Sequence, residues 1–133
     1  MRVFLDTNVL VSAFATRGVC ADVLRVVLAE HTLVTSEVVL GELFRALRTR
    51  LKLPARTIHE IEMFLRAHEV HPRPEAPSPI EIRDPADRWV LASAVDARAE
   101  LLVTGDRDLL DVAADLPVKI VNPRAFWDLM RRP

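Results

Sequence analysis

The sequence predicts an α/β fold, a three-layer sandwich in which helices flank a central, mostly parallel sheet. Short apolar runs that suit buried strands alternate with longer segments whose apolar residues recur every three or four positions, as on one face of a helix. An acidic residue lies directly after one of these short runs and three residues after another, where α/β folds gather functional groups at the carboxyl ends of strands. A chain of 133 residues falls within the size range of one domain, so we expect a single unit over residues 1–133.

The N-terminal half predicts strand, helix, strand and then two helices. Residues 3–5 form an apolar strand that ends at Asp6, and residues 21–30 have helical spacing. Residues 32–35 are rich in β-branched side chains and predict a second strand, with Ser36 placed to cap the next helix. That helix runs from residue 37 to about residue 50, and Pro54 can occupy the first turn of another that packs against it.

The C-terminal half begins with a loop and continues as helix, strand, strand and helix. Four prolines within residues 72–79 exclude a regular helix or central strand there. Asp84 can cap a helix with Pro85 at its first position and Asp87 in its first turn, extending to about residue 98. The remaining predicted elements are strands at residues 101–103 and 118–121 and a helix after Pro123.

Composition excludes several classes of protein and site. Half of the residues are hydrophobic and 28% are charged, which suits a folded globular chain. A single cysteine excludes an internal disulfide and a zinc site built from several thiolates, and the histidines show no metal-ligand spacing. Apolar stretches are far shorter than the roughly 20 residues of a membrane-spanning helix, and the N-terminus lacks a signal-peptide pattern, so we expect a cytoplasmic protein without membrane contact.

Charge is distributed unevenly along the chain. The formal net charge is -1, without the excess of basic residues typical of a nucleic-acid binder. Residues 43–66 nevertheless hold six basic side chains against two acidic ones, and residues 84–115 hold eight acidic side chains against three arginines. A basic rim beside an acidic centre fits a protein that binds a polyanion through metal ions, while two solvated helix faces would give the same pattern.

Four acids occupy positions that this layout would bring together: Asp6, Glu42, Asp87 and Asp106. Clustered carboxylates repel unless a cation lies between them, and Mg²⁺ binds such groups together with substrate phosphate. Each acid alone also has a structural explanation. Asp87 could be a dipole partner and Asp106 a turn or cap residue, and Glu42 could pair with a nearby arginine on a solvent-facing helix.

The order of four short motifs resembles that of PIN-domain nucleases. LDTNVL at residues 5–10 is similar to the N-terminal signature of that family, and SEVVLGEL at residues 36–43 to its second acidic motif. DPAD at residues 84–87 is similar to the third motif and LVTGDRDLL at residues 102–110 to the fourth. The motifs are short, and their common order makes the resemblance specific.

The resemblance implies a Mg²⁺- or Mn²⁺-dependent endoribonuclease whose metal-binding, catalytic acids are Asp6, Glu42, Asp87 and Asp106. Asn8 and Thr104 would orient ligands or water by hydrogen bonds, and Asp108 is a candidate fifth acid. A stand-alone domain of this size further resembles the VapC-like toxin half of bacterial toxin-antitoxin pairs. That resemblance implies a homodimer and a small antitoxin protein as partner.

The candidate contacts to the RNA backbone are Arg45, Arg48, Arg50, Lys52 and Arg56. The spacing of Arg45, Arg48 and Lys52 predicts one shared helical face next to Glu42. An acidic protein partner could use the same surface. Other functions that fit parts of the pattern are a non-catalytic PIN-fold binding module and a housekeeping RNA-processing nuclease. A phosphatase of the haloacid-dehalogenase type is disfavoured, because its general acid would stand where this chain has Asn8.

Overall fold

The computed structural model describes residues 1–112 and 115–131, and its centre is a five-stranded sheet with the order β3-β2-β1-β4-β5. Every neighbouring pair of these strands is parallel, so the sheet is parallel throughout rather than mostly parallel. The strands are β1 (Arg2–Leu5), β2 (Thr32–Ser36), β3 (Glu69–His71), β4 (Leu101–Val103) and β5 (Lys119–Val121). The α/β class and the flanking of the sheet by helices agree with the sequence-based prediction.

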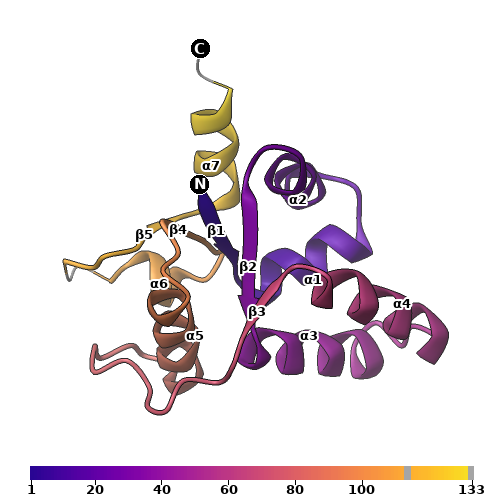
Figure 1. Cartoon of the computed structure of the whole chain (residues 1–133), viewed down its shortest axis with the longest axis horizontal. Coiled ribbons are helices and arrows are strands. Elements are labelled where there is room, and N and C mark those ends of the chain that lie inside the picture. Colours follow the sequence, from indigo (N-terminus) through magenta and orange to yellow (C-terminus); the bar gives the residue numbers. More distant parts are fainter. Residues whose placement is uncertain (113–114, 132–133) are drawn as a thin grey trace.

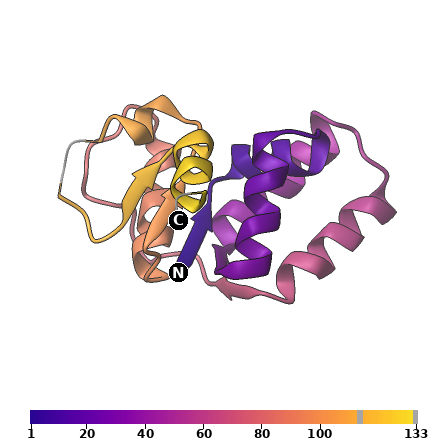
Figure 2. The same cartoon turned by 90° about the horizontal axis from the view of Figure 1, so that it is seen from above.

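The helices gather on either side of these strands. In Figures 1 and 2, α1 to α4 lie to one side, and α5 and α6 lie to the other. Helix α7 packs against α2, where the ring of Phe126 meets the edge of His31. The helices are α1 (Thr7–Ala15), α2 (Val19–Glu30), α3 (Glu37–Thr49), α4 (Ala55–Arg66), α5 (Pro85–Asp96), α6 (Arg107–Leu110) and α7 (Pro123–Met130).

The core explains why the strands are apolar without alternation. Val3, Phe4 and Leu5 of β1 are fully buried, as expected for a central strand covered on both faces. Leu102 and Val103 of β4 are buried in the same way. None of the described helices combines the length and apolar character needed to cross a membrane.

Strand order places the ends of β1 and β4 side by side. The chain moves from β1 outward to β2 and β3 on one side, and then returns to form β4 and β5 on the other. Such a reversal of strand order leaves a crevice at the carboxyl ends of the two central strands, which is where open α/β sheets bind ligands. Asp6 follows β1 and Thr104 follows β4, so both lie at this position.

The structure adds three elements that the sequence pattern did not predict. Helix α6 is only four residues long, too short to show helical periodicity. Helix α1 begins immediately after Asp6, and its consecutive buried residues Val9, Leu10 and Val11 give no amphipathic periodicity. Strand β3 is three half-buried residues at the sheet edge, too short to give a strand pattern.

Several predicted boundaries also differ from those in the structure. Helix α2 starts at Val19 instead of residue 21. Pro54 precedes the first residue of α4 instead of lying in its first turn. Helix α5 ends at Asp96, two residues before the predicted end, and Arg98 has a positive φ of 56° that a continuing helix cannot have.

Candidate metal centre

Asp6 lies where the central strand β1 ends and α1 begins. The residue is 4% exposed, and its side chain caps α1 by accepting a 2.7 Å hydrogen bond at Oδ1 from the backbone N–H of Thr7. Its Oδ2 accepts a second bond of 2.7 Å from the hydroxyl of Thr104. Both bonds, and the positive end of the α1 dipole, favour the charged form of a carboxylate that burial disfavours.

Thr104 and Asn8 join the ends of β1 and β4. Besides donating to Asp6, the fully buried Oγ1 of Thr104 accepts a 2.9 Å hydrogen bond from the backbone N–H of Asp106. Asn8 Oδ1 accepts a longer bond, 3.4 Å, from the backbone N–H of Gly105. The hydroxyl of Thr104 therefore fixes the position of Asp6 relative to the loop that carries Asp106.

Asp87 projects from the first turn of α5. Asp84 caps this helix by accepting a 3.0 Å bond from the N–H of Ala86, as expected from the DPAD segment. Asp87 is only 6% exposed, and its Oδ2 is buried without a hydrogen-bond partner in the described structure. A buried carboxylate oxygen without a donor is costly, so a role as dipole partner alone leaves this atom unexplained.

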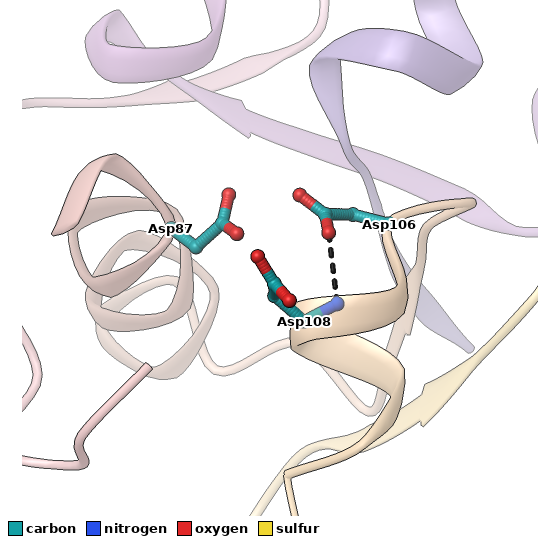
Figure 3. A group of neighbouring side chains, drawn as sticks. All are labelled: Asp87, Asp106 and Asp108. Carbon is teal, nitrogen blue, oxygen red and sulfur yellow. Dashed lines mark hydrogen bonds between the residues drawn. The ribbon is translucent and has the colours of Figure 1, made fainter. Parts of the chain in front are cut away.

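Asp106 and Asp108 face Asp87 from the loop after β4 and the start of α6. Asp106 caps α6 through a 2.9 Å bond that its Oδ1 accepts from the N–H of Asp108. Figure 3 shows the three carboxyl groups pointing toward one another from α5, from α6 and from the loop that precedes α6. One oxygen of each lies within 4.8 Å of the others. None of the described basic side chains forms an ion pair with these three carboxyl groups, so the cluster is electrostatically repulsive.

Glu42 approaches the same region from α3. Ser36 caps this helix by accepting a 3.5 Å bond from the N–H of Val39, and Ser36 is itself fully buried where the chain passes from β2 into the helix. The Glu42 side chain is half-buried and forms no ion pair with Arg45 or Arg48 among the described residues. Glu42 is therefore not a solvent-facing residue that pairs with an arginine of its own helix among the described residues.

A single pocket of about 190 Å³ collects these groups. Its lining includes all four acids singled out in the sequence together with the helix cap Asp84, one basic side chain and the polar residues after β1: Asp6, Glu42, Asp87, Asp106, Asp84, Arg50, Thr7 and Asn8. We call it the acidic pocket. Asp108 lies in the carboxylate cluster of Figure 3 but not in the lining of this pocket.

Burial raises the pKa of Asp6 and Asp87. For Asp6, the hydrogen bonds from Thr104 and Thr7 oppose the effect of burial, and the charge of Asp106 adds to it. For Asp87, burial, pairing with the Asp106 carboxyl and the nearby charges of other acids together raise the pKa to about 8. Asp87 thus retains a proton at a pH where isolated aspartates are ionised.

The pKa of Glu42 is also raised, first by burial and then by the negative charges of Asp6 and Asp84. Arg45 and Arg73 oppose this rise through their positive charges. Three acids of the pocket are therefore destabilised in their charged form, which is the condition that a bound cation would relieve.

The donor set fits a hard divalent cation. All the clustered side chains offer carboxylate oxygens, the ligands that Mg²⁺ and Mn²⁺ prefer, and the unpartnered Oδ2 of Asp87 is free to bind. One oxygen of each of Asp87, Asp106 and Asp108 lies within 4.8 Å of the others, so these three carboxylates are close enough together to share one cation.

The basic residues near the pocket differ from the set expected. Arg45 is exposed on α3 and lines two hollows that also include Glu42. The prediction that Lys52 shares a helical face with Arg45 and Arg48 is wrong. Helix α3 ends at Thr49, where the N–H groups of residues 50 and 51 both bond to Ala46 O, and Lys52 has a left-handed φ of 52°.

Two further arginines lie near the site, of which the sequence analysis singled out only Arg50. This candidate RNA contact lines the acidic pocket itself. Arg73 lines a neighbouring hollow with Glu42 and lies over the ring of Trp89, 4.2 Å from its centroid. Arg73 belongs to the proline-rich loop, which has no periodicity from which its position could be predicted.

Comparisons with known proteins agree with this architecture. A family model described as "PIN domain" matches residues 2–108. No match was found among curated proteins. The VapBC2 structure from Rickettsia felis, bound to a DNA fragment from its promoter, contains a similar chain, with a TM-score of 0.67 and 18% identity, covering 92% of this chain and 98% of that one.

Two structures of the Fit system are also similar. One is FitAB bound to the IR36 DNA fragment, with a TM-score of 0.63 and 19% identity over 91% of this chain and 94% of that one. The other is FitAcB from Neisseria gonorrhoeae, with a TM-score of 0.61 and 19% identity over 92% of this chain and 98% of that one. At these identities the likeness concerns the fold.

Proposed function

The chain belongs to the PIN-domain family, and on this premise we propose that it is a Mg²⁺- or Mn²⁺-dependent endoribonuclease whose acidic pocket holds the metal. The observation that carries the proposal is the buried carboxyl of Asp87, which lies with Asp106 and Asp108 in a cluster of carboxylates and whose Oδ2 has no hydrogen-bond partner among the described residues. A cation or a proton would stabilise this cluster.

The residues of the site would hold the cation, support its ligands or attract the RNA. Asp6, Glu42, Asp87 and Asp106 hold the cation, and Asp108 is close enough to bind it directly or through water. Thr104 and Asn8 keep Asp6 and the loop after β4 in place. When bound, the cation supplies Lewis-acid chemistry, activating water for attack on phosphorus and stabilising charge on the phosphate. Arg50, which lines the same pocket, is positioned to attract the RNA backbone.

A non-catalytic binding module is the alternative from a different class. The raised pKa values of Asp6, Glu42 and Asp87 argue against it. A domain that binds no metal would gain stability by replacing these side chains with neutral ones, so their presence favours a function for the charge.

The family resemblance and the fold neighbours support a proposal for the biological role. We extend to this chain the arrangement named in the VapBC2 structure, a complex bound to promoter DNA. The chain would then be the toxin of a toxin-antitoxin pair, a homodimer bound by a small antitoxin. A housekeeping RNA-processing nuclease is the alternative, and it would need no such partner. Inhibition of cleavage by the product of an adjacent small reading frame would support the toxin assignment, while a gene without such a neighbour would favour the housekeeping role.

Cleavage of RNA by purified protein tests the enzymatic proposal. Labelled single-stranded RNA should be cut internally with Mg²⁺ or Mn²⁺ and left intact in excess chelator. Asp6→Asn keeps the size and the capping oxygen but removes a negative ligand, so its activity should fall to that of a blank preparation. Asp22→Asn, an exposed acid in the first turn of α2, is the matched control and should cut normally. Cleavage that persists in chelator, or in the Asp6 variant, would overturn the proposal.

A further inference from the structure

A second pocket, of about 230 Å³, adjoins the acidic pocket and is lined by side chains of α3, α5 and the loop between β3 and α5. Glu42 and Ala86 line both pockets, so a molecule in one lies beside the other. We call it the side pocket. Its lining includes Gly41, Arg45, Arg73 and Trp89.

Apart from the shared Glu42, the charged side chains of the side pocket that form no ion pair among the described residues are positive. Its other carboxylate, Glu37, is already paired with both guanidinium nitrogens of Arg66, at 2.8 and 2.9 Å. Arg45 and Arg73 are both exposed and form no ion pair among the residues that the structure describes. Two unpaired guanidinium groups next to a metal site suit the phosphates that flank a scissile bond.

The side pocket also offers a flat surface. The guanidinium of Arg73 lies over the half-buried indole of Trp89, 4.2 Å from the ring centroid. Trp89 packs against the core, which fixes the ring and so supports the arginine above it. Aromatic rings and arginine planes are the surfaces on which proteins stack unpaired bases.

Gly41 leaves room in the side pocket. Glycine is unfavourable inside a helix, yet Gly41 lies in the middle of α3. A Cβ built at this position would meet nothing within 4 Å, so packing does not require the glycine. The missing side chain instead leaves this part of the side pocket open.

We infer that the side pocket binds one unpaired nucleotide of the RNA next to the phosphate that is cut. Arg45 and Arg73 contact its phosphate, and its base stacks on the surface formed by Arg73 and Trp89. This inference rests on the proposed function only in placing the nucleotide next to the cleaved phosphate, and binding of the nucleotide can be measured without cleavage. A base inside a duplex is already stacked on both faces, so the substrate class is single-stranded RNA.

Fluorescence of Trp89 reports on this site directly. The chain has two tryptophans, and Trp127→Phe leaves Trp89 as the only one. With Asp6→Asn added to prevent cleavage, titration with oligouridine should quench the fluorescence to a plateau. An abasic oligomer of equal length keeps the phosphates but lacks bases, so it should bind more weakly and quench less.

Three substitutions distinguish the charge of Arg73, the flat surface of its guanidinium and the open space at Gly41. Arg73→Ala should weaken oligouridine binding about tenfold, the order of one lost stacking surface, and reduce the salt slope by about 0.7 for one lost phosphate contact. Arg73→Lys should restore the salt slope without restoring the affinity, because a lysine has charge but no plane. Gly41→Leu should remove the quench by filling the side pocket while keeping the helical circular dichroism of the parent. Arg17→Ala, an exposed arginine that lines neither pocket, is the control.

The outcomes distinguish this inference from the proposed function. Saturable quenching that depends on Arg73 and Gly41 supports the nucleotide site even if the wild-type protein cuts no RNA. Metal-dependent cleavage by a protein whose RNA binding is unchanged in Arg73→Ala and Gly41→Leu overturns the site and leaves the nuclease in place. Quenching by polyglutamate at lower concentration than by oligouridine also overturns it, and would assign the side pocket to an acidic protein partner.

Discussion

Replacing Asp87 with asparagine should stabilise the metal-free protein while removing its activity. The pKa of this buried carboxyl rises from 3.8 to about 8 on folding. Because the folded chain binds the proton more tightly than the unfolded chain, this group does not lower the free energy of unfolding at low pH. Its destabilising effect grows as the pH rises from about 4 toward 8, where Asp87 ionises in the unfolded chain but not in the folded chain.

The size of the effect follows from the same shift. At about 1.4 kcal/mol per pH unit, the whole rise corresponds to roughly 6 kcal/mol. The acidic pocket opens to solvent, and screening there reduces the expected gain for Asp87→Asn at pH 8 to about 2–3 kcal/mol. For a chain of this length, such a gain raises the Tm by roughly 6–10 °C.

Thermal unfolding in chelator at pH 5 and pH 8 measures this gain. The Tm of the variant should exceed that of the wild type by more at pH 8 than at pH 5. Other titrating groups affect both proteins equally and cancel in this comparison; one is Glu69, whose pKa the neighbouring Arg2 and His71 lower to about 2. Asp22→Asn, at the equivalent place in α2, should lose a few tenths of a kcal/mol at both pH values. If Asp87 were only a dipole partner, its variant would behave like that control, and a lower Tm at pH 8 would refute the reasoning.

Three further predictions concern the metal, its support and the RNA. Thr104→Val should lower Mn²⁺ affinity about 10–100-fold in calorimetry, because Asp6 loses its hydroxyl donor, and Thr104→Ser should restore it; equal affinities would contradict that role. Saturating Mg²⁺ should raise the Tm more at pH 8 than at pH 5, because protons and the cation compete for the same carboxylates, and equal gains would contradict this. Alanine at Arg45, Arg48 and Lys52 together should weaken RNA binding and flatten its salt dependence, whereas an unchanged slope measured across a salt series would exclude backbone contacts.

The residues that the sequence placed correctly are those next to regular elements. Asp6 follows an apolar strand, and Asp84 and Asp87 begin a helix with a cap and a proline, so local chemistry fixes their positions. Glu42 required more, since the direction of α3 relative to β1 decides whether it meets Asp6. The order of the four motifs, and not the sequence around Glu42, predicted that Glu42 meets Asp6.

The residues that the sequence misplaced or missed depend on irregular backbone. Lys52 follows the end of α3 in a left-handed conformation, so the helical spacing from Arg45 no longer applies to it. Arg73 lies in a loop with neither helical nor strand periodicity, and only the folded chain brings it over Trp89. Long-range contacts of this kind leave no pattern within a short window of sequence.

Anomalous diffraction from crystals soaked in Mn²⁺ would show whether the acidic pocket is a metal centre. We expect a peak in contact with carboxylate oxygens of Asp87 and Asp106, within reach of Asp6 and Glu42, and we expect this peak to be lost in crystals of Asp87→Asn. A pocket that stays empty at saturating Mn²⁺, or an ion bound only outside it, would rule out a metal centre there.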